Sequence, residues 1–150
     1  MSLSAVSTAQ VTEIAAEVFE SMVDGQPGLL TAWPGGPASV VSPLHAWVDL
    51  DTEPAGRVHL TIEAAVADDL ARALLELEAT EPVAEADVVD AFGEIANICS
   101  GNIKGLLPEH VELRLPEVSP QSPSGVGAVR LLEVMLAWRG HPLVITVWTV

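Results

Sequence analysis

Apolar residues recur at helical spacing in three parts of the chain. In residues 10–24 they return every three or four positions, with Thr12 as a suitable N-cap and Gly25 as a stop signal. Residues 66–78 carry a stripe of leucines, and a longer helix is expected near 85–105. The pattern therefore predicts three amphipathic helices.

Alternating apolar and polar residues predict the strands between these helices. We expect strands at 46–51, 57–64, 110–115, 129–138 and 143–150, and a short one at Ala38–Val41 inside the Gly- and Pro-rich loop 25–46. The last two long strands are apolar on both faces in places, as in the centre of a sheet or beneath a partner. This order predicts a single α+β domain over 1–150, with an antiparallel sheet and helices packed on one face. Residues 1–9 are expected to be flexible or left over from expression.

The longest helix has two distinct faces when its residues are placed at about 100° per residue. The face expected to be buried consists of Val88, Phe92, Ile95, Ala96, Cys99 and Ile103. The opposite face is a polar stripe of Asp90, Glu94, Asn97 and Gly101, with Gly93 and Ser100 beside it. Each glycine costs up to about 1 kcal/mol relative to Ala inside a helix, which suggests that another backbone comes close here. Taken alone, the pattern still favours an ordinary solvated face, with Gly101 ending the helix.

The amino-acid composition limits the kinds of molecule that the chain is expected to bind. The net charge of −15 argues against nucleic acid and anionic membrane surfaces, which bind clustered Lys and Arg. The chain has no apolar run long enough to span a membrane and no signal peptide, so we expect a cytoplasmic protein. Its single cysteine, Cys99, allows no internal disulfide and is expected to be a buried thiol. The four histidines show no metal-ligand spacing in the sequence.

Glu94 and Asn97 are the stripe residues with usable chemistry. Side chains three residues apart on a helix point the same way. The carboxylate can pair with a cation, and the carboxamide can hold a water molecule by donating and accepting hydrogen bonds. Neither is a strong nucleophile, and no histidine stands at helical spacing beside them. Such a pair is better suited to completing a partner's active site than to forming one alone.

The spacing Asp90-x-x-x-Glu94-x-x-Asn97-x-x-x-Gly101-Asn102 resembles the signature helix of the CheC/CheX/FliY phosphatases of bacterial chemotaxis. In that family an acid or Ser is followed by Glu four residues on and by Asn three further, often with Gly-Asn after them. A proline further along the family pattern corresponds to Pro120 or to Pro116. The order of helices and strands also fits the CheC-like α/β sandwich, although loop 25–46 is longer and richer in Pro and Gly than expected.

An internal repeat, typical of the family, is visible as a trace. Residues 17–25 can be placed alongside residues 90–98, and Ser21 and Asp24 then stand where the second copy has Glu94 and Asn97. CheC-like members carry the pair in both helices, whereas this chain carries it once, as CheX-like members do. The resemblance therefore implies one site per chain and a CheX-like homodimer.

The resemblance also implies dephosphorylation of a phosphorylated response regulator, a CheY-like receiver. The receiver supplies the phospho-aspartate, the Mg²⁺ and a lysine, so the phosphatase needs no cofactor or metal of its own. By carry-over, Asn97 aligns the attacking water and Glu94 pairs with the receiver's lysine. Asp90, Gly93 and Gly101 are expected to contact the partner. Asn102 points away from the stripe toward the buried side, so a structural role at the helix end is expected of it.

Two alternatives remain at this point. The chain could be a non-catalytic, CheX-like dimeric module that binds a partner in a chemotaxis or two-component pathway without turnover. The carboxamide of Asn97 argues against this, because only the chemistry requires it. The chain could also be a structural dimer that binds no regulator.

Overall fold

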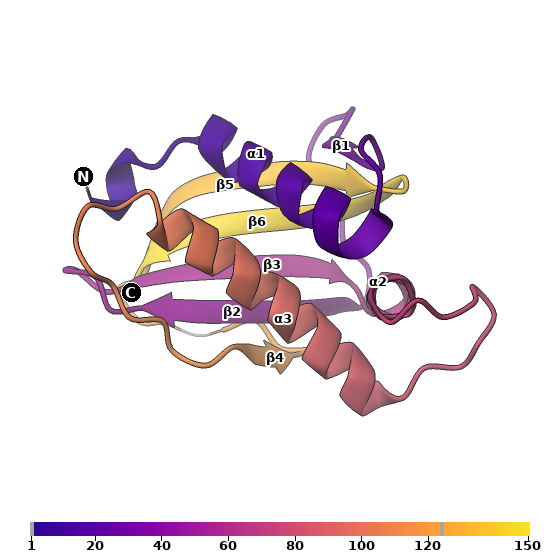
Figure 1. Ribbon diagram of the computed structural model, residues 1–150. Helices are drawn as coiled ribbons and strands as arrows, with labels where there is room; N and C mark the ends of the chain where they lie inside the picture. The colour runs from indigo at the N-terminus through magenta and orange to yellow at the C-terminus, as the bar shows by residue number, and fades with distance from the viewer. Residues whose placement is uncertain (1, 124) are drawn as a thin grey trace.

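The computed structural model describes residues 2–123 and 125–150, and in it one six-stranded sheet is covered by helices on one face (Figure 1). The strands are β1 (Leu30–Ala32), β2 (Pro43–Leu50), β3 (Gly56–Glu63), β4 (Glu117–Ser119), β5 (Val129–Trp138) and β6 (His141–Thr149). The helices are the 3₁₀ turn η1 (Leu3–Ala5), α1 (Thr8–Val18), the π-helical turn η2 (Phe19–Asp24), α2 (Ala64–Leu74) and α3 (Glu85–Lys104). The strand order is β1-β5-β6-β3-β2-β4, and each neighbouring pair is antiparallel. The predicted α+β class is confirmed.

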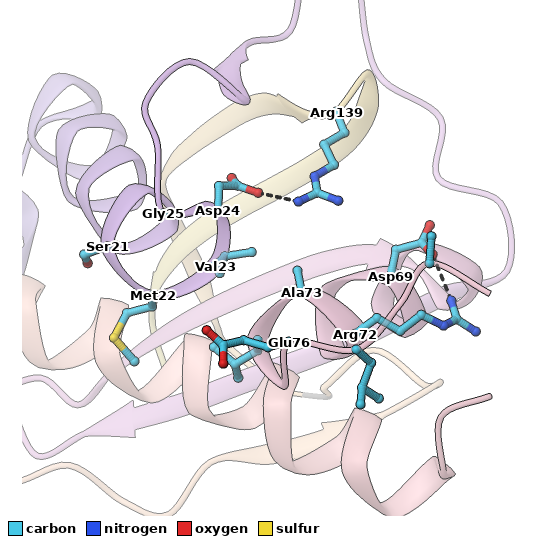
Figure 2. Close-up of a pocket in the computed structure, with 13 residues that line it drawn as sticks. Ser21, Met22, Val23, Asp24, Gly25, Asp69, Arg72, Ala73, Glu76 and Arg139 are labelled. Atoms are coloured by element: carbon cyan, nitrogen blue, oxygen red, sulfur yellow. Dashed lines mark hydrogen bonds and ion pairs between the residues drawn. The ribbon is translucent and has the colours of Figure 1, made fainter. Parts of the chain in front are cut away.

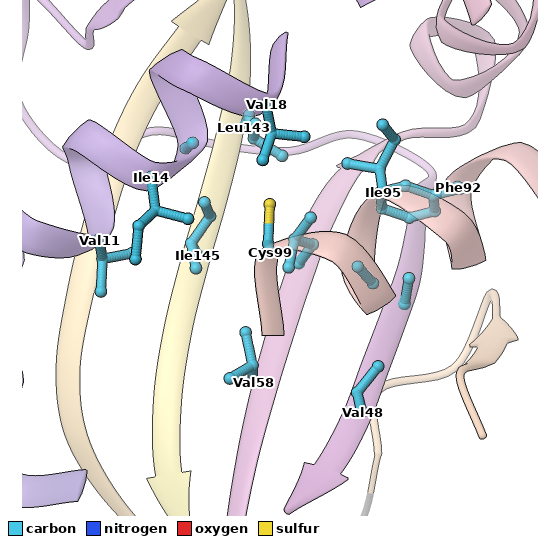
Figure 3. Close-up of a cluster of buried hydrophobic side chains, with 14 of the residues drawn as sticks. Val11, Ile14, Val18, Val48, Val58, Phe92, Ile95, Cys99, Leu143 and Ile145 are labelled. Atoms are coloured by element: carbon cyan, nitrogen blue, oxygen red, sulfur yellow. The ribbon is translucent and has the colours of Figure 1, made fainter. Parts of the chain in front are cut away.

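The hydrophobic core lies between the sheet and helices α1 and α3 (Figure 3). Strand β3 turns Val58, Leu60 and Ile62 toward it, and central strand β6 does the same with alternate residues. Burial of these side chains stabilises the fold by roughly 25 cal/mol for each Å² of apolar surface removed from water. The apolar character of β6 is thus explained by its place between β5 and β3.

Most predicted elements are present within a few residues of their expected bounds. The first helix starts earlier than expected, because Ser7 and Gln10 form a capping box: Ser7 Oγ accepts from the Gln10 backbone N–H at 3.1 Å, and Gln10 Oε1 accepts from the Ser7 N–H at 2.9 Å. The expectation of Thr12 as N-cap is wrong, since Thr12 lies inside α1 and donates to the Thr8 carbonyl. Gly25 ends η2 in the left-handed conformation, as the sequence predicted.

Two strand predictions need correction. Residues 38–41 form no strand, and the strand of this loop is β1, paired with the end of β5. Residues 110–115 make only an isolated bridge between Leu113 and Leu50, because the chain bulges there and Pro116 offers no N–H for a ladder. The strand that pairs with β2 in this region is β4, at Glu117–Ser119.

The N-terminal segment packs against the core, contrary to the expectation of a flexible start. Leu3 is 3% exposed and Val6 is 5% exposed. Leu3 sits against Gly56, where an added Cβ would collide with its side chain. Met1 lies outside the described residues. No helix in the described part of the chain is both long and apolar enough to cross a membrane.

Candidate functional site

Helix α3 crosses the sheet obliquely and is the longest helix of the fold (Figure 1). It has 20 residues, with Glu85 and Asp87 in its first turn and Lys104 in its last. Acids near the N-terminus and a cation near the C-terminus both stabilise the helix dipole. Its predicted apolar face is confirmed, because all six of the residues assigned to it are buried.

The polar stripe lies on the opposite, accessible side of α3. Asp90 and Glu94 are exposed, and Asn97 is half-buried. Within residues 2–123 and 125–150, no salt bridge involves either acid, and no hydrogen bond involves any of the three side chains. Three polar side chains on a rigid helix are thus left without intramolecular partners, which suits a surface that meets another molecule.

The two glycines of α3 accommodate the chain's own segment 113–118. A Cβ on Gly93 would lie 3.5 Å from Val118 and 3.7 Å from Pro116, and Gly93 is buried beneath them. A Cβ on Gly101 would lie 3.9 Å from Leu113. The side chains that approach α3 here therefore belong to this chain. Gly101 also lies within the helix, which continues to Lys104.

This packing distinguishes the two candidate prolines. Pro116 rests against Gly93 of α3, whereas Pro120 is exposed beyond β4. The expectation for Asn102 is wrong, because its side chain is exposed rather than turned to the buried side.

Two buried polar residues on α3 are structural. Ser100 Oγ donates to the Ala96 carbonyl at 2.7 Å, which satisfies a hydroxyl that is fully buried. Burial raises the pKa of the Cys99 thiol to about 12, so it stays protonated at neutral pH. The prediction of a buried thiol is confirmed.

Asp24, which aligns with Asn97 in the suggested internal repeat, is held by contacts within the chain. Figure 2 shows Asp24 pointing to Arg139, which donates a hydrogen bond to it at 2.8 Å. Trp138 Nε1 donates to the same carboxylate, whose side chain is only 1% exposed. Asp24 and Arg139 border a cavity of about 460 Å³ between η2 and the end of α2, and Arg72, which also lines it, is paired with Asp69. Asp24 is therefore occupied by structural bonds, in contrast to Asn97.

The structure brings together two histidines that are far apart in the sequence. His45 Nδ1 lies 2.8 Å from His59 Nε2 on the sheet face turned away from the helices, and Thr61 Oγ1 lies within 3.2 Å of both. Burial, with the nearby charges of His45 and Arg57, lowers the pKa of His59 to about 4. Register explains the pair, since His45 lies opposite Thr61 and His59 opposite Trp47. The alternation of apolar and polar residues in the two strands places both histidines on the outer face of the sheet. Only the hairpin register shows that they are neighbours.

In chemical terms, α3 offers a carboxylate and a carboxamide one turn apart on an exposed surface. Among the described residues, no group of three or more His, Cys, Asp or Glu is arranged to hold a metal ion. The histidine pair lies on the opposite face of the sheet from α3. The arrangement can therefore orient a water molecule and pair with a cation, but the reacting group has to come from a partner.

Comparisons with known proteins identify a matching family and similar folds. The sequence profile of the family described as "Chemotaxis phosphatase CheX" matches residues 44–126, which include the whole of α3. The chemotaxis protein CheX from Desulfovibrio desulfuricans has a similar structure, with a TM-score of 0.69 and 17% identity over 95% of this chain and 98% of that one. CheX from Vibrio vulnificus gives a TM-score of 0.68 and 13% identity over 93% of each chain. A CheX–CheY–BeF₃–Mg²⁺ complex from Borrelia burgdorferi gives 0.65 and 16% identity, over 94% of this chain and 95% of that chain. No curated protein sequence matches the chain.

Proposed function

Because the chain belongs to the CheX family of chemotaxis phosphatases, we propose that it removes the phosphoryl group from the phospho-aspartate of a CheY-like receiver domain. The observation that carries the proposal is the pair of exposed Glu94 and half-buried Asn97, whose side chains have no partner within the described chain. The similar protein from Borrelia burgdorferi forms a complex with CheY, BeF₃ and Mg²⁺, which supports a receiver as the partner here.

In the proposed mechanism α3 docks over the phosphorylation site of the receiver. Asn97 enters the site, and its carboxamide holds the attacking water in line with phosphorus. Glu94 pairs with the receiver's lysine and so fixes the register of docking. Catalysis of phosphoryl transfer consists largely of positioning and charge stabilisation, and alignment alone can supply several kcal/mol. Mg²⁺ is expected on the receiver, so this chain needs no cofactor of its own.

The remaining stripe residues have supporting parts in this proposal. Asp90 and Gly101 are accessible beside the pair, and we assign them to contact with the receiver. Gly93 is buried under Pro116, so it acts indirectly by allowing segment 113–118 to lie close to α3. The acidic end of the helix, with Glu85 and Asp87, adds a field that attracts a basic surface.

The homodimer expected from the family stays a proposal. Helices cover one face of the sheet, and the other carries Trp47, His59 and Trp148. The outermost strands β1 and β4 have three residues each. Light scattering after size-exclusion chromatography would give the mass in solution. A mass of one chain over the working concentration range would contradict the dimer.

The cytoplasmic location also stays a prediction.

Phosphate release from a phosphorylated receiver tests the function directly. The wild type should accelerate release, and Asn97→Ala should reduce kcat by at least tenfold while the protein still binds the receiver. Glu94→Ala should weaken docking and turnover together. Asn102→Ala is the matched control, because it removes an exposed asparagine from the same helix outside the stripe. Binding of a phosphate-mimicking receiver without any turnover would favour the non-catalytic binding module instead.

A further inference from the structure

The segment between α3 and β4 contains one residue more than the strand it faces. Leu113 bridges to Leu50, and Val118 pairs with Ala46. Strand β2 takes four steps between its two residues, whereas the facing segment takes five. An extra residue on one side of an antiparallel pair is a β-bulge, which redirects a side chain and is over-represented next to active sites.

The bulge contains Leu115 and Pro116, and it sends them in different directions. Pro116 turns onto α3 at Gly93. Val111 is buried and Leu113 half-buried, and the same alternation would bury Leu115. Leu115 is instead 86% exposed. The bulge has therefore moved a side chain with the pattern of a core residue out to the surface.

Leu115 belongs to a segment that runs along α3, the helix of the candidate catalytic pair. Leu113 approaches the Gly101 turn of α3, and Pro116 approaches the Gly93 turn. Segment 113–118 thus runs along the helix. Leu115 falls between Leu113 and Pro116 in this segment, and Glu94 and Asn97 fall between the two glycine turns that they approach. An exposed leucine is common on protein surfaces. Its position on a bulge alongside the stripe makes this one notable.

The segment is held in place on both sides of Leu115. The Arg114 N–H donates to the Asp49 carbonyl at 2.8 Å, and the Asp51 N–H donates to the Glu112 carbonyl at 2.9 Å. Beyond the bulge, Trp47 Nε1 donates to the Glu117 carboxylate at 3.1 Å. A contact made by a side chain on a fixed backbone loses little conformational entropy on binding.

We propose that Leu115 is a docking contact for the receiver domain and determines its affinity, while Glu94 and Asn97 carry the chemistry. The inference rests on the proposed function, because a receiver that takes Asn97 into its phosphorylation site must also cover segment 113–118. The partner surface that fits is an apolar patch beside the phosphorylated aspartate. Interfaces commonly combine one buried apolar anchor with polar contacts around it.

The test compares Leu115→Ser with Val126→Ser. Val126 is also a fully exposed aliphatic residue, and its loop lies near Arg57, on the sheet face away from α3. Each variant is titrated with a CheY receiver from the same genome, loaded with BeF₃⁻ and Mg²⁺, to give Kd. Phosphate release is then measured separately with the phosphorylated form of the same receiver. We expect Leu115→Ser to raise Kd and KM about tenfold, with kcat at saturation unchanged. Val126→Ser should match the wild type, and both variants should keep the wild-type Tm.

The outcomes separate the two proposals. If Leu115→Ser binds the loaded receiver within twofold of the wild type, Leu115 is no docking contact, whatever the turnover. If the wild type binds the receiver and releases no phosphate, the phosphatase proposal fails, and the Kd values of the two variants still decide the role of Leu115. Failure of the wild type to bind any loaded receiver would overturn the docking contact, as would a kcat that falls with Kd unchanged.

Discussion

The carboxylate of Asp24 accepts a hydrogen bond from Trp138 Nε1, at 3.1 and 3.3 Å from its two oxygens. Arg139 also donates to Asp24, and its guanidinium lies 4.6 Å from the centre of the Trp138 ring. These contacts tie the end of η2 to the β5–β6 hairpin. In the internal repeat that the sequence suggests, Asp24 of η2 aligns with Asn97 of α3. Asp24 makes structural contacts, whereas Asn97 belongs to the candidate site.

Replacement of Asp24 by Ala should lower the free energy of unfolding by about 2–3 kcal/mol. The change leaves the Trp138 indole N–H and the Arg139 guanidinium without their carboxylate. Urea unfolding followed by tryptophan fluorescence measures the effect. Glu20→Ala, an exposed acid on the same turn, should stay within about 0.5 kcal/mol of the wild type. Equal midpoints for the two variants would show that the Asp24 contacts contribute nothing.

The glycines of α3 allow a test that separates stability from function. A Cβ on Gly101 would meet only Leu113, at 3.9 Å, so alanine fits and should stabilise the helix by up to about 1 kcal/mol. If Gly101 touches the receiver as proposed, the same substitution should raise KM while Tm rises. Gly93→Leu should instead destabilise by about 1–3 kcal/mol, because it would displace Pro116 and Val118.

Thermal unfolding and phosphate-release kinetics of these variants provide the two measurements. Gly93→Ala is the matched control for the larger side chain, since a lone Cβ would stand at ordinary contact distances from Val118 and Pro116. A stable Gly93→Leu protein would mean that segment 113–118 is not packed on α3. An unchanged KM in Gly101→Ala would remove Gly101 from the docking surface.

Long periodic elements were predictable from the sequence, because their apolar faces reveal which side is buried. Helix α3 and strands β5 and β6 formed where expected. The short strands β1 and β4 were missed, since three residues give no period and each forms by pairing with a distant strand. The strand predicted at 110–115 did not form for a related reason. Its apolar and polar residues do alternate, but the bulge and Pro116 interrupt its pairing with β2.

The candidate site was predictable to a different degree for each residue. Glu94 and Asn97 follow from helical spacing and the family motif, and both lie on an accessible face. The reason for Gly93 could not be predicted, because it depends on a segment more than twenty residues later folding back onto α3. The exposure of Leu115 required the count of residues on both sides of the bulge. Such relationships exist only once the strands are paired.

The thiol of Cys99 should be inert in the folded protein. Its side chain is 1% exposed and its pKa is raised to about 12 by burial, so almost no thiolate forms at pH 8. A thiol reagent such as DTNB should react with the native protein only at the rate of unfolding. The same reagent should titrate one thiol rapidly in denaturing urea. Rapid reaction without denaturant would contradict the burial of Cys99.

Stability should fall as the pH drops below about 6.5, and the histidine pair supplies part of this dependence. Desolvation of His59, with the nearby charges of His45 and Arg57, lowers its pKa to about 4 in the folded protein. An unfolded chain would protonate His59 near its ordinary pKa of 6.5. Between pH 4 and 6.5 the unfolded state binds more protons at His59 than the folded state does. The contribution of neutral His59 to stability is therefore fully present above pH 6.5 and is lost as the pH falls toward 4. The full effect is roughly 3 kcal/mol.

His59→Gln isolates this contribution, because glutamine keeps a polar side chain beside His45 and cannot be protonated in this range. Urea unfolding at a series of pH values should show a smaller loss of stability between pH 6.5 and 4 in the variant than in the wild type. Carboxylates that titrate in the same range affect both proteins alike, so the difference between the two curves reports His59. His110→Gln, which changes an exposed histidine, should leave the wild-type curve in place. Parallel curves for the wild type and His59→Gln would mean that His59 accepts a proton in the folded protein as readily as in the unfolded chain.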